Sequence, residues 1–244
     1  MKYKKVILKL SGEALSGPDL FGFDFKRIKK IAEEVKIFQE KPARGRGTRP
    51  GKINLAIIVG GGNIFRARML EGGEIDRVDA DYMGMLATNL NALAIHNYFK
   101  KQKIKSVVLS ELPVNNLISK FSIAKAQNYW KQNKILIFSG GTGKPYFTTD
   151  TCALLKAQKM KADIVLKATQ VCGVYDQDPE KYPQAKMFKN LTYQTALDKN
   201  LKIMDKEAFQ IAQKMKIPIR VFKWQKGNLR KVIEGKNLGT IIYN

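Results

Sequence analysis

Four stretches of this sequence place residues suited to hold phosphate directly after a short apolar run. The first, Val6-Ile7-Leu8-Lys9-Leu10-Ser11-Gly12, has a lysine near the end of the run and then a Ser-Gly turn. A buried lysine is costly without a partner, while Ser11 and Gly12 let backbone N–H groups approach an anion closely. The stretch therefore predicts a phosphate contact by Lys9. The alternative is a strand that ends in a lysine whose head reaches solvent.

The second stretch carries three consecutive glycines, Gly60-Gly61-Gly62, after the apolar run that ends at Val59, and Arg66 follows them. Glycines permit a turn with positive φ and let the backbone close on an anion, and an arginine can bind a phosphate through two N–H groups. The spacing differs from the Gly-x-Gly-x-x-Gly fingerprint of dinucleotide-binding folds. A structural glycine turn beside an unrelated arginine is an equally good interpretation of this stretch alone.

The third stretch runs from Phe138 to Asp150 and is rich in glycine and hydroxyl residues. Its Gly143-Lys144 pair resembles part of a P-loop, but Pro145 stands where a P-loop needs serine or threonine. We therefore interpret it as a loop that holds a polar ligand through O–H and N–H donors and leads into a helix near Thr149. Asp150 is also a candidate for the cap of that helix.

The fourth stretch, Val165 to Pro179, is an apolar run followed by a turn with an aromatic residue and two acids. Tyr175 is suited to stack on a purine, and Asp178 to hold a ribose hydroxyl or act through Mg²⁺. A β-turn that ends at Asp178-Pro179 is the simpler alternative.

The elements that position these stretches alternate between strands and helices. Apolar runs rich in Val and Ile predict strands over Lys5–Leu10, Ile53–Val59, Ser106–Leu109, Ile135–Phe138, Asp163–Leu166 and Ile217–Phe222. Apolar residues at three- and four-residue spacing predict helices after Asp24, over Asp81–Asn97 and after Asp205, and Asp24 is placed to cap the first of them. Continuously apolar strands that alternate with helices indicate a mostly parallel sheet covered on both faces, which is a three-layer αβα sandwich. All four stretches would then lie at the carboxyl edge of the sheet, where open α/β sheets bind ligands.

Size and charge narrow the class of protein. With 244 residues, 44% of them hydrophobic, the chain is large enough to bury a full core. Its 44 Lys and Arg against 21 Asp and Glu give a net charge of +23, which attracts polyanions such as nucleotides or nucleic acid. The segment from Lys41 to Lys52 has five basic residues and no acid, and we expect a flexible basic surface loop there.

The sequence gives little support for a disulfide-rich, metal-binding or membrane protein. Two cysteines, Cys152 and Cys172, do not have the spacing of a disulfide or zinc framework, and we expect no metal ligands among the side chains. No apolar run approaches the roughly 20 residues that cross a bilayer. Since the chain opens without a signal-like apolar stretch, we expect a cytoplasmic protein without a membrane partner.

Several longer segments of the chain resemble bacterial UMP kinases, which belong to the amino acid kinase superfamily. These segments are Lys9–Leu15, Gly60–Arg66, Asp76–Val78, Ala80–Thr88, Phe147–Asp150, Ala162–Thr169 and Ile217–Phe222. The resemblance implies the amino acid kinase fold as a single domain over residues 1–244, with an acceptor-binding lobe over about 1–160 and an ATP-binding lobe over about 161–244. It also implies a homohexamer that transfers the γ-phosphoryl group of ATP to UMP, with Mg²⁺ bound to the ATP phosphates.

The resemblance further implies roles for particular residues. Lys9 and Asp150 would be catalytic, with Asp150 organising the phosphate-binding lysines. The residues implied to bind ATP are Lys9, Leu10, Ser11, Gly12, Gly62, Arg66, Thr169, Tyr175 and Asp178. Those implied to bind UMP are Gly61, Arg66, Asp81, Thr142, Gly143, Lys144, Pro145, Tyr146, Phe147, Thr148 and Thr149.

Three departures from the family pattern are visible. The Lys41–Lys52 segment is longer and more basic than usual, Lys144 stands where relatives commonly have asparagine, and Gly17–Gly22 only loosely resembles the region implicated in GTP activation. Two alternatives stay open. One is a kinase of the same superfamily that acts on a carboxylate such as acetylglutamate or aspartate, and the other is a nucleic-acid-binding regulator that uses the positive charge.

Overall fold

The computed structural model describes residues 1–39, 53–66, 75–201 and 203–244. The basic loop expected over 41–52 lies outside these residues. The chain forms two compact units, which we name by their place in the sequence. The central unit is Leu10–Thr149, and the terminal unit combines Met1–Lys9 with Asp150–Asn244.

The described residues of the central unit form four parallel strands. They are β2 (Asn54–Val59), β3 (Ser106–Ser110), β4 (Ser119–Lys120) and β5 (Ile135–Ser139), in the spatial order β4-β3-β5-β2. Every residue of β5 is buried, and so are five of the six residues of β2. This continuous burial is typical of strands covered on both faces, as the apolar runs predicted.

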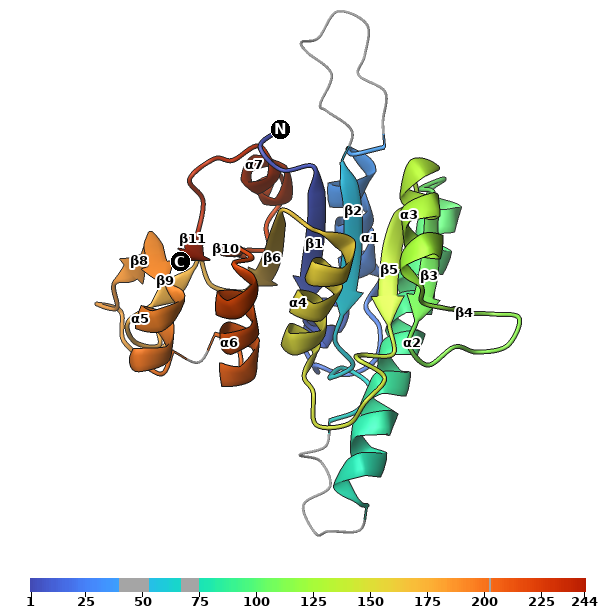
Figure 1. Ribbon diagram of the computed structural model, residues 1–244, viewed down its shortest axis with the longest axis horizontal. Coiled ribbons are helices and arrows are strands. Elements are labelled where there is room, and N and C mark those ends of the chain that lie inside the picture. The colour runs from blue at the N-terminus through green and yellow to red at the C-terminus, as the bar shows by residue number, and fades with distance from the viewer. Residues whose placement is uncertain (40–52, 67–74, 202) are drawn as a thin grey trace, which may run out of the picture. The chain divides into compact units, whose positions relative to one another are not determined.

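Among its described residues, the central unit also has three α-helices and one short 3₁₀ helix (Figure 1). They are η1 (Gly12–Ala14), α1 (Phe25–Lys36), α2 (Arg77–Lys101) and α3 (Ile123–Lys131). Asp24 caps α1 by accepting a hydrogen bond from the N–H of Lys26, as the sequence predicted. Helix α2 begins four residues before the predicted start, because Asp76 caps it through the N–H of Val78.

The terminal unit contains the other large group of strands, in the order β1-β6-β10-β11-β9. Their bounds are β1 (Lys5–Leu10, whose last residue belongs to the central unit), β6 (Ile164–Thr169), β9 (Asn190–Thr192), β10 (Ile219–Lys223) and β11 (Thr240–Tyr243). All neighbours pair in parallel except β10 and β11. Strands β7 (Val174–Tyr175) and β8 (Met187–Phe188) form a separate antiparallel pair.

The helices of the terminal unit are α4 (Thr149–Met160), α5 (Tyr193–Asp198), α6 (Lys206–Met215) and α7 (Asn228–Ile233). The helix predicted after Asp205 is present as α6, and Asp205 caps it through the N–H of Ala208. The α/β class with mostly parallel strands is therefore confirmed.

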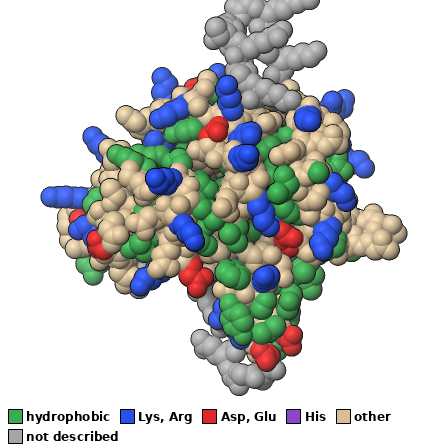
Figure 2. Space-filling view, in the orientation of Figure 1, with side chains coloured by type: hydrophobic (Ala, Val, Ile, Leu, Met, Phe, Trp, Pro, Cys, Tyr) green, Lys and Arg blue, Asp and Glu red, His purple; other side chains and the backbone are tan. Residues whose placement is uncertain are grey.

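The surface carries the charge that the composition predicts. Figure 2 shows Lys and Arg side chains scattered over the face in view, and a group of hydrophobic side chains over the lower end of α2. Among the helices of the described residues, none is both long and apolar enough to span a lipid bilayer.

Candidate active site

A cluster of two lysines and one aspartate lies in the terminal unit. Strands β1 and β6 pair in a register that places Lys9 directly beside Lys167. The carboxylate of Asp150, in the first turn of α4, lies between them, with its oxygens 2.8 Å from Lys9 Nζ and 2.6 Å from Lys167 Nζ. All three side chains are only 11–12% exposed. The register of the strands and the start of α4 thus bring two ammonium groups to one carboxylate.

The electrostatics of this cluster leave an excess of positive charge. Burial by itself raises the pKa of Asp150, but Lys9 and Lys167 outweigh it, so the pKa of Asp150 is lowered and the group is a carboxylate at neutral pH. Burial lowers the pKa of Lys167 and the charge of Lys9 adds to this, while Asp150 and Asp205 act in the opposite direction. Lys167 also donates a hydrogen bond to the carbonyl oxygen of Ile203. Two cations that share one buried anion are suited to bind a phosphoryl group.

Lys167 is a candidate that the sequence analysis did not single out. A signal was present, because both β1 and β6 read as three apolar residues followed by lysine: Val6-Ile7-Leu8-Lys9 and Ile164-Val165-Leu166-Lys167. Each lysine thus stands at the same place in its strand, and the pairing of β1 with β6 makes the two lysines neighbours. Asp150, considered as a helix cap, instead lies inside the first turn with its carboxylate on the lysines.

The residues expected around adenosine lie in the same unit. Thr169, at the end of β6, donates from its hydroxyl to the carbonyl oxygen of Val171 at 2.8 Å. Tyr175 is half-buried on β7. Asp178 is exposed and accepts a hydrogen bond from the N–H of Glu180 at 3.0 Å. Thr169 and Asp178 are thus held by local turns rather than by each other, and their roles toward a nucleotide stay predictions.

In the central unit, two of the predicted glycine turns meet. A Cβ added to Gly12 would lie 2.5 Å from Asn63 Oδ1 and 2.8 Å from the backbone nitrogen of Gly62, which no side chain tolerates. The N–H of Gly60 donates to the carbonyl oxygen of Leu10 at 3.0 Å. The Ser11-Gly12 turn and the Gly60–Gly62 turn therefore form one backbone surface, and Gly12 is required because the second turn lies against it.

Arg66 is held beside these turns by the protein itself. Its guanidinium donates to Glu13 Oε1 and, through Nε, to the carbonyl oxygen of Gly62. Glu13 is a second residue that the sequence analysis did not single out. An arginine has five N–H donors, so donors remain for an anion after these two bonds.

Asp81 and the hydroxyl-rich loop also come together in the central unit. The carboxylate of Asp81 accepts hydrogen bonds from the Arg77 Nε at 3.1 Å and from the backbone N–H of Tyr146 at 2.7 Å. Tyr146 has a positive φ of 69°, which is uncommon for a residue with a side chain. The Thr142 hydroxyl donates to the carbonyl oxygen of Lys144 at 3.0 Å and shapes the start of the loop. Asp81 therefore fixes the loop that was expected to bind UMP.

The loop presents much of its length to solvent. Lys144, Tyr146, Phe147 and Thr148 are exposed, while Thr142, Gly143, Pro145 and Thr149 are partly exposed. Gly143 has a φ of 77°, which explains the glycine at that position.

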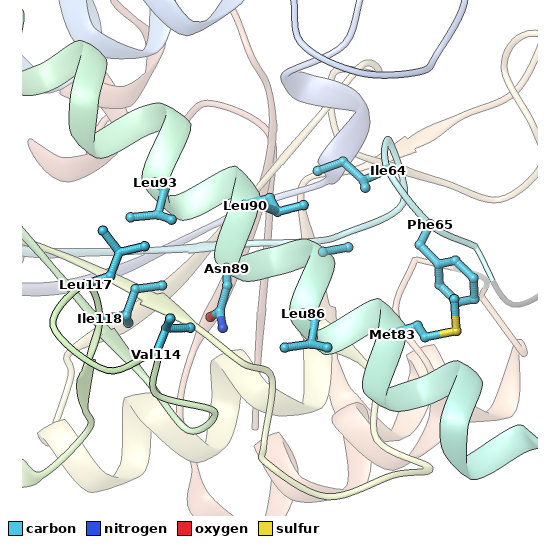
Figure 3. Close-up of a pocket in the computed structure, with 11 residues that line it drawn as sticks. Ile64, Phe65, Met83, Leu86, Asn89, Leu90, Leu93, Val114, Leu117 and Ile118 are labelled. Carbon is cyan, nitrogen blue, oxygen red and sulfur yellow. The ribbon is translucent and has the colours of Figure 1, made fainter.

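A separate apolar groove of about 500 Å³ lies along α2. Figure 3 shows Leu86, Leu90 and Leu93 of α2 on one side, with Val114, Leu117 and Ile118 of the facing segment on the other. The lining is almost entirely apolar, so the groove is unsuited to a phosphorylated ligand.

In the part of the chain that the structure describes, no three or more His, Cys, Asp or Glu side chains are grouped as metal ligands. The charged groups gathered at the strand ends are mainly cationic, and such groups bind anions rather than metal ions.

The chain is similar to known proteins over nearly its whole length. The family model described as "Amino acid kinase family" matches residues 4–223. The uridylate kinase of Serratia proteamaculans is 42% identical over 241 residues, covering 98% of this chain and 96% of that protein. The crystal structure of the UMP kinase of Bacillus anthracis superposes with a TM-score of 0.91 at 32% identity, covering 100% of this chain and 97% of the other. The UMP kinase of Ureaplasma parvum gives a TM-score of 0.88 at 34% identity, with both chains fully covered. The protein whose Lys9, Asp150 and Lys167 form this cluster belongs to the amino acid kinase family.

Proposed function

We propose that this chain is a UMP kinase, which transfers the γ-phosphoryl group of ATP to UMP and gives UDP and ADP. UMP is proposed as the phosphoryl acceptor because the chain is similar to uridylate kinases over nearly its full length. The observation that supports the chemistry is the pair of lysines around Asp150, because phosphoryl transfer needs positive charge held in position.

Lys9 and Lys167 supply electrostatic stabilisation in this mechanism. Phosphoryl transfer has a loose transition state with charge spread over the phosphoryl oxygens, so fixed cations contribute more than any proton transfer. The ammonium groups of Lys9 and Lys167 contact those phosphoryl oxygens. Asp150 lies between the two ammonium groups and orients both of them toward the phosphoryl oxygens. No protein base and no covalent intermediate are required. ATP is the donor as its Mg²⁺ complex, in which the phosphate oxygens are the principal ligands of the metal.

The remaining residues bind and align the two nucleotides. Leu10, Ser11, Gly12 and Gly62 present backbone N–H groups and a hydroxyl to ATP phosphates, and Thr169, Tyr175 and Asp178 line adenosine. On the acceptor side, Gly61 and Arg66 bind phosphate, Asp81 binds the ribose hydroxyls, and the loop from Thr142 to Thr149 surrounds uracil and the UMP phosphate.

Asp81→Ala tests the acceptor assignment. We expect the KM for UMP to rise about 10- to 100-fold, the scale of a lost hydrogen bond to a charged group, because the ribose contact and the Tyr146 N–H contact are both removed. The KM for ATP should change little. Asp79→Ala, an exposed acid two residues earlier on the same helix, is the control and should leave both constants unchanged. An unchanged KM for UMP in the Asp81 variant counts against the ribose assignment.

Acceptor specificity tests the function itself. Purified protein with ATP and Mg²⁺ is assayed for ADP release with UMP, CMP, dUMP, acetylglutamate and aspartate. We expect UMP to give the highest kcat/KM by a wide margin. Faster turnover of either carboxylate would replace the proposal with an acyl-phosphate-forming kinase.

We also propose that the enzyme works in the cytoplasm as a homohexamer, in which the groove along α2 contacts a second copy of the chain. Leu86 and Leu90 are 49% and 51% exposed, which is unusual for two leucines one turn apart on one helix. Light scattering after gel filtration should give six times the chain mass of 27.6 kDa. Leu90→Glu should shift the mass to a smaller species, and a monomeric wild-type protein would contradict the assembly.

A further inference from the structure

We infer that Asn91 and Asn63 are positioning residues for phosphoryl transfer, which act by holding the backbone of the Gly60–Gly62 turn in its anion-binding conformation. The identity of the anion as a phosphoryl group rests on the proposed function. The role of the two asparagines in holding the turn rests on the geometry of the central unit alone.

The two asparagines form a closed pair inside the central unit. Asn63 is 1% exposed and Asn91 is fully buried. Asn63 Nδ2 donates to Asn91 Oδ1 at 3.0 Å, and Asn91 Nδ2 donates to Asn63 Oδ1 at 2.7 Å. Each amide therefore satisfies the other, which is why two such polar groups can be buried together.

The second N–H of each amide reaches a backbone carbonyl. Asn91 donates to the carbonyl oxygen of Gly60 at 2.6 Å, and Asn63 donates to that of Gly22 at 2.8 Å. Gly22 in return donates its N–H to the carbonyl oxygen of Asn63 at 2.8 Å. The pair thus joins α2, the glycine turn and the Gly22 segment through fully used amide donors.

The bond to Gly60 sets the direction of the next donor in the chain. A trans peptide is planar, so its C=O and the following N–H point in opposite directions. Holding the Gly60 carbonyl against Asn91 therefore turns the N–H of Gly61 away from Asn91 and out of the core. The N–H groups of Gly61 and Gly62 donate to no residue that the structure describes. An oriented N–H on Gly61, next to a second N–H on Gly62 that also has no described protein acceptor, is suited to receive phosphoryl oxygens.

Packing alone does not fix this turn. A Cβ added to Gly61 would lie 2.6 Å from the carbonyl oxygen of Gly84 and 3.0 Å from the Cβ of Ala87, so the turn lies close against α2. That contact limits how near the turn comes to the helix, but the peptide plane can still rotate, because glycine has access to most of φ/ψ space. The hydrogen bond from Asn91 is what selects one orientation.

The test compares Asn91→Asp with a matched change elsewhere in the central unit. Asn91→Asp keeps the shape of the side chain and replaces the donating NH₂ group with a carboxyl oxygen. Gln39→Glu is the control, because the Gln39 amide also bridges two backbone carbonyls, those of Lys105 and Asn133, and has no described contact with the Gly60–Gly62 turn. Both changes are expected to lower the Tm.

Activity should separate the two variants. Well below both Tm values, we expect the kcat/KM of Asn91→Asp to fall about 10²-fold, the scale of a misplaced binding group, while Gln39→Glu stays within about threefold of wild type. A double-mutant cycle compares Asn63→Ala, Asn91→Ala and the double variant. The double variant should lose no more activity than the less active single variant, because both residues act through one network. Equal activity losses in Asn91→Asp and Gln39→Glu, or additive losses in the cycle, would overturn the positioning role.

Hydrogen exchange tests the positioning role of Asn91 independently of the proposed function. If the wild-type protein does not phosphorylate UMP, the function is wrong, but the amides of the peptide that covers residues 55–65 should still exchange at least tenfold faster in Asn91→Asp than in wild type. Unchanged exchange there would show that Asn91 does not hold the turn, whatever the substrate.

Discussion

Lys9→Ala is expected to lower kcat by about 10²- to 10³-fold, the scale of removing one preorganised donor from a transition state. The protein should remain folded, because Asp150 keeps its 2.6 Å contact with Lys167 after Lys9 is removed. The KM values should change less than kcat, since the charge of Lys9 matters most where the transferring oxygens carry the most charge.

Lys5→Ala provides the control for this experiment. Lys5 begins the same strand, and its side chain has no contact with the Asp150 cluster among those described. Steady-state kinetics and circular dichroism of both variants give the result. Near-normal turnover by a folded Lys9→Ala protein would remove Lys9 from the mechanism.

Asp150→Asn should produce the largest loss of stability of any single change in the cluster. The substitution keeps the shape of the side chain but leaves two buried ammonium groups side by side without their shared anion. Breaking a buried ion pair in this way typically costs about 3–5 kcal/mol. Asp163→Asn is the control. Asp163 accepts hydrogen bonds from the backbone N–H groups of Lys4 and Lys5, at 2.6 and 2.9 Å, so we expect its substitution to lower the stability less than Asp150→Asn does.

The pKa of Asp150 determines how the stability difference between wild type and Asp150→Asn changes with pH. The pKa of Asp150 in the folded protein is lowered below its ordinary value of 3.8, so its carboxylate stabilises the fold fully at pH values above that. The contribution is lost as the pH falls through the lowered pKa. The difference in unfolding free energy between wild type and Asp150→Asn should therefore be largest near neutral pH and shrink in acid. Denaturant unfolding at pH 7 and at pH values well below 3.8 measures it, and a difference that grows in acid contradicts the assignment.

ATP should restore part of the stability lost in Asp150→Asn. Triphosphate oxygens can replace the missing carboxylate between Lys9 and Lys167, so the ligand stabilises the variant more than the wild type by mass action. A thermal shift with ATP that is the same size in both proteins would count against a phosphate site at these lysines.

The fold could be predicted from the sequence wherever burial is continuous. Runs such as Leu55–Val59 and Ile135–Phe138 are apolar throughout because both faces of their strands are covered, and the structure has strands there. The helix cap Asp24 and the helix after Asp205 were predicted because capping and apolar periodicity are local along the chain. The short strands β4, β7, β8 and β9 have two or three residues each and carry too little pattern to detect.

Candidate site residues could be named from the sequence only in part, and the contacts between them could not be predicted. The glycines at 12 and 60–62 could be identified from chain-local chemistry, whereas the contact between the two turns depends on tertiary packing. Lys167 was missed for the same reason, since its importance comes from the register Lys9↔Lys167. The partner of Arg66 proved to be Glu13, 53 residues away, which no spacing rule could indicate.

The central claim is that fixed positive charge at Lys9 and Lys167 drives phosphoryl transfer from ATP to UMP. Its most direct test follows the label from γ-labelled ATP in the presence of UMP and Mg²⁺, with wild type and Lys9→Ala side by side. We predict labelled UDP from the wild type and a rate lower by at least two orders of magnitude from the variant. Folded wild-type protein that leaves UMP unlabelled would contradict the claim.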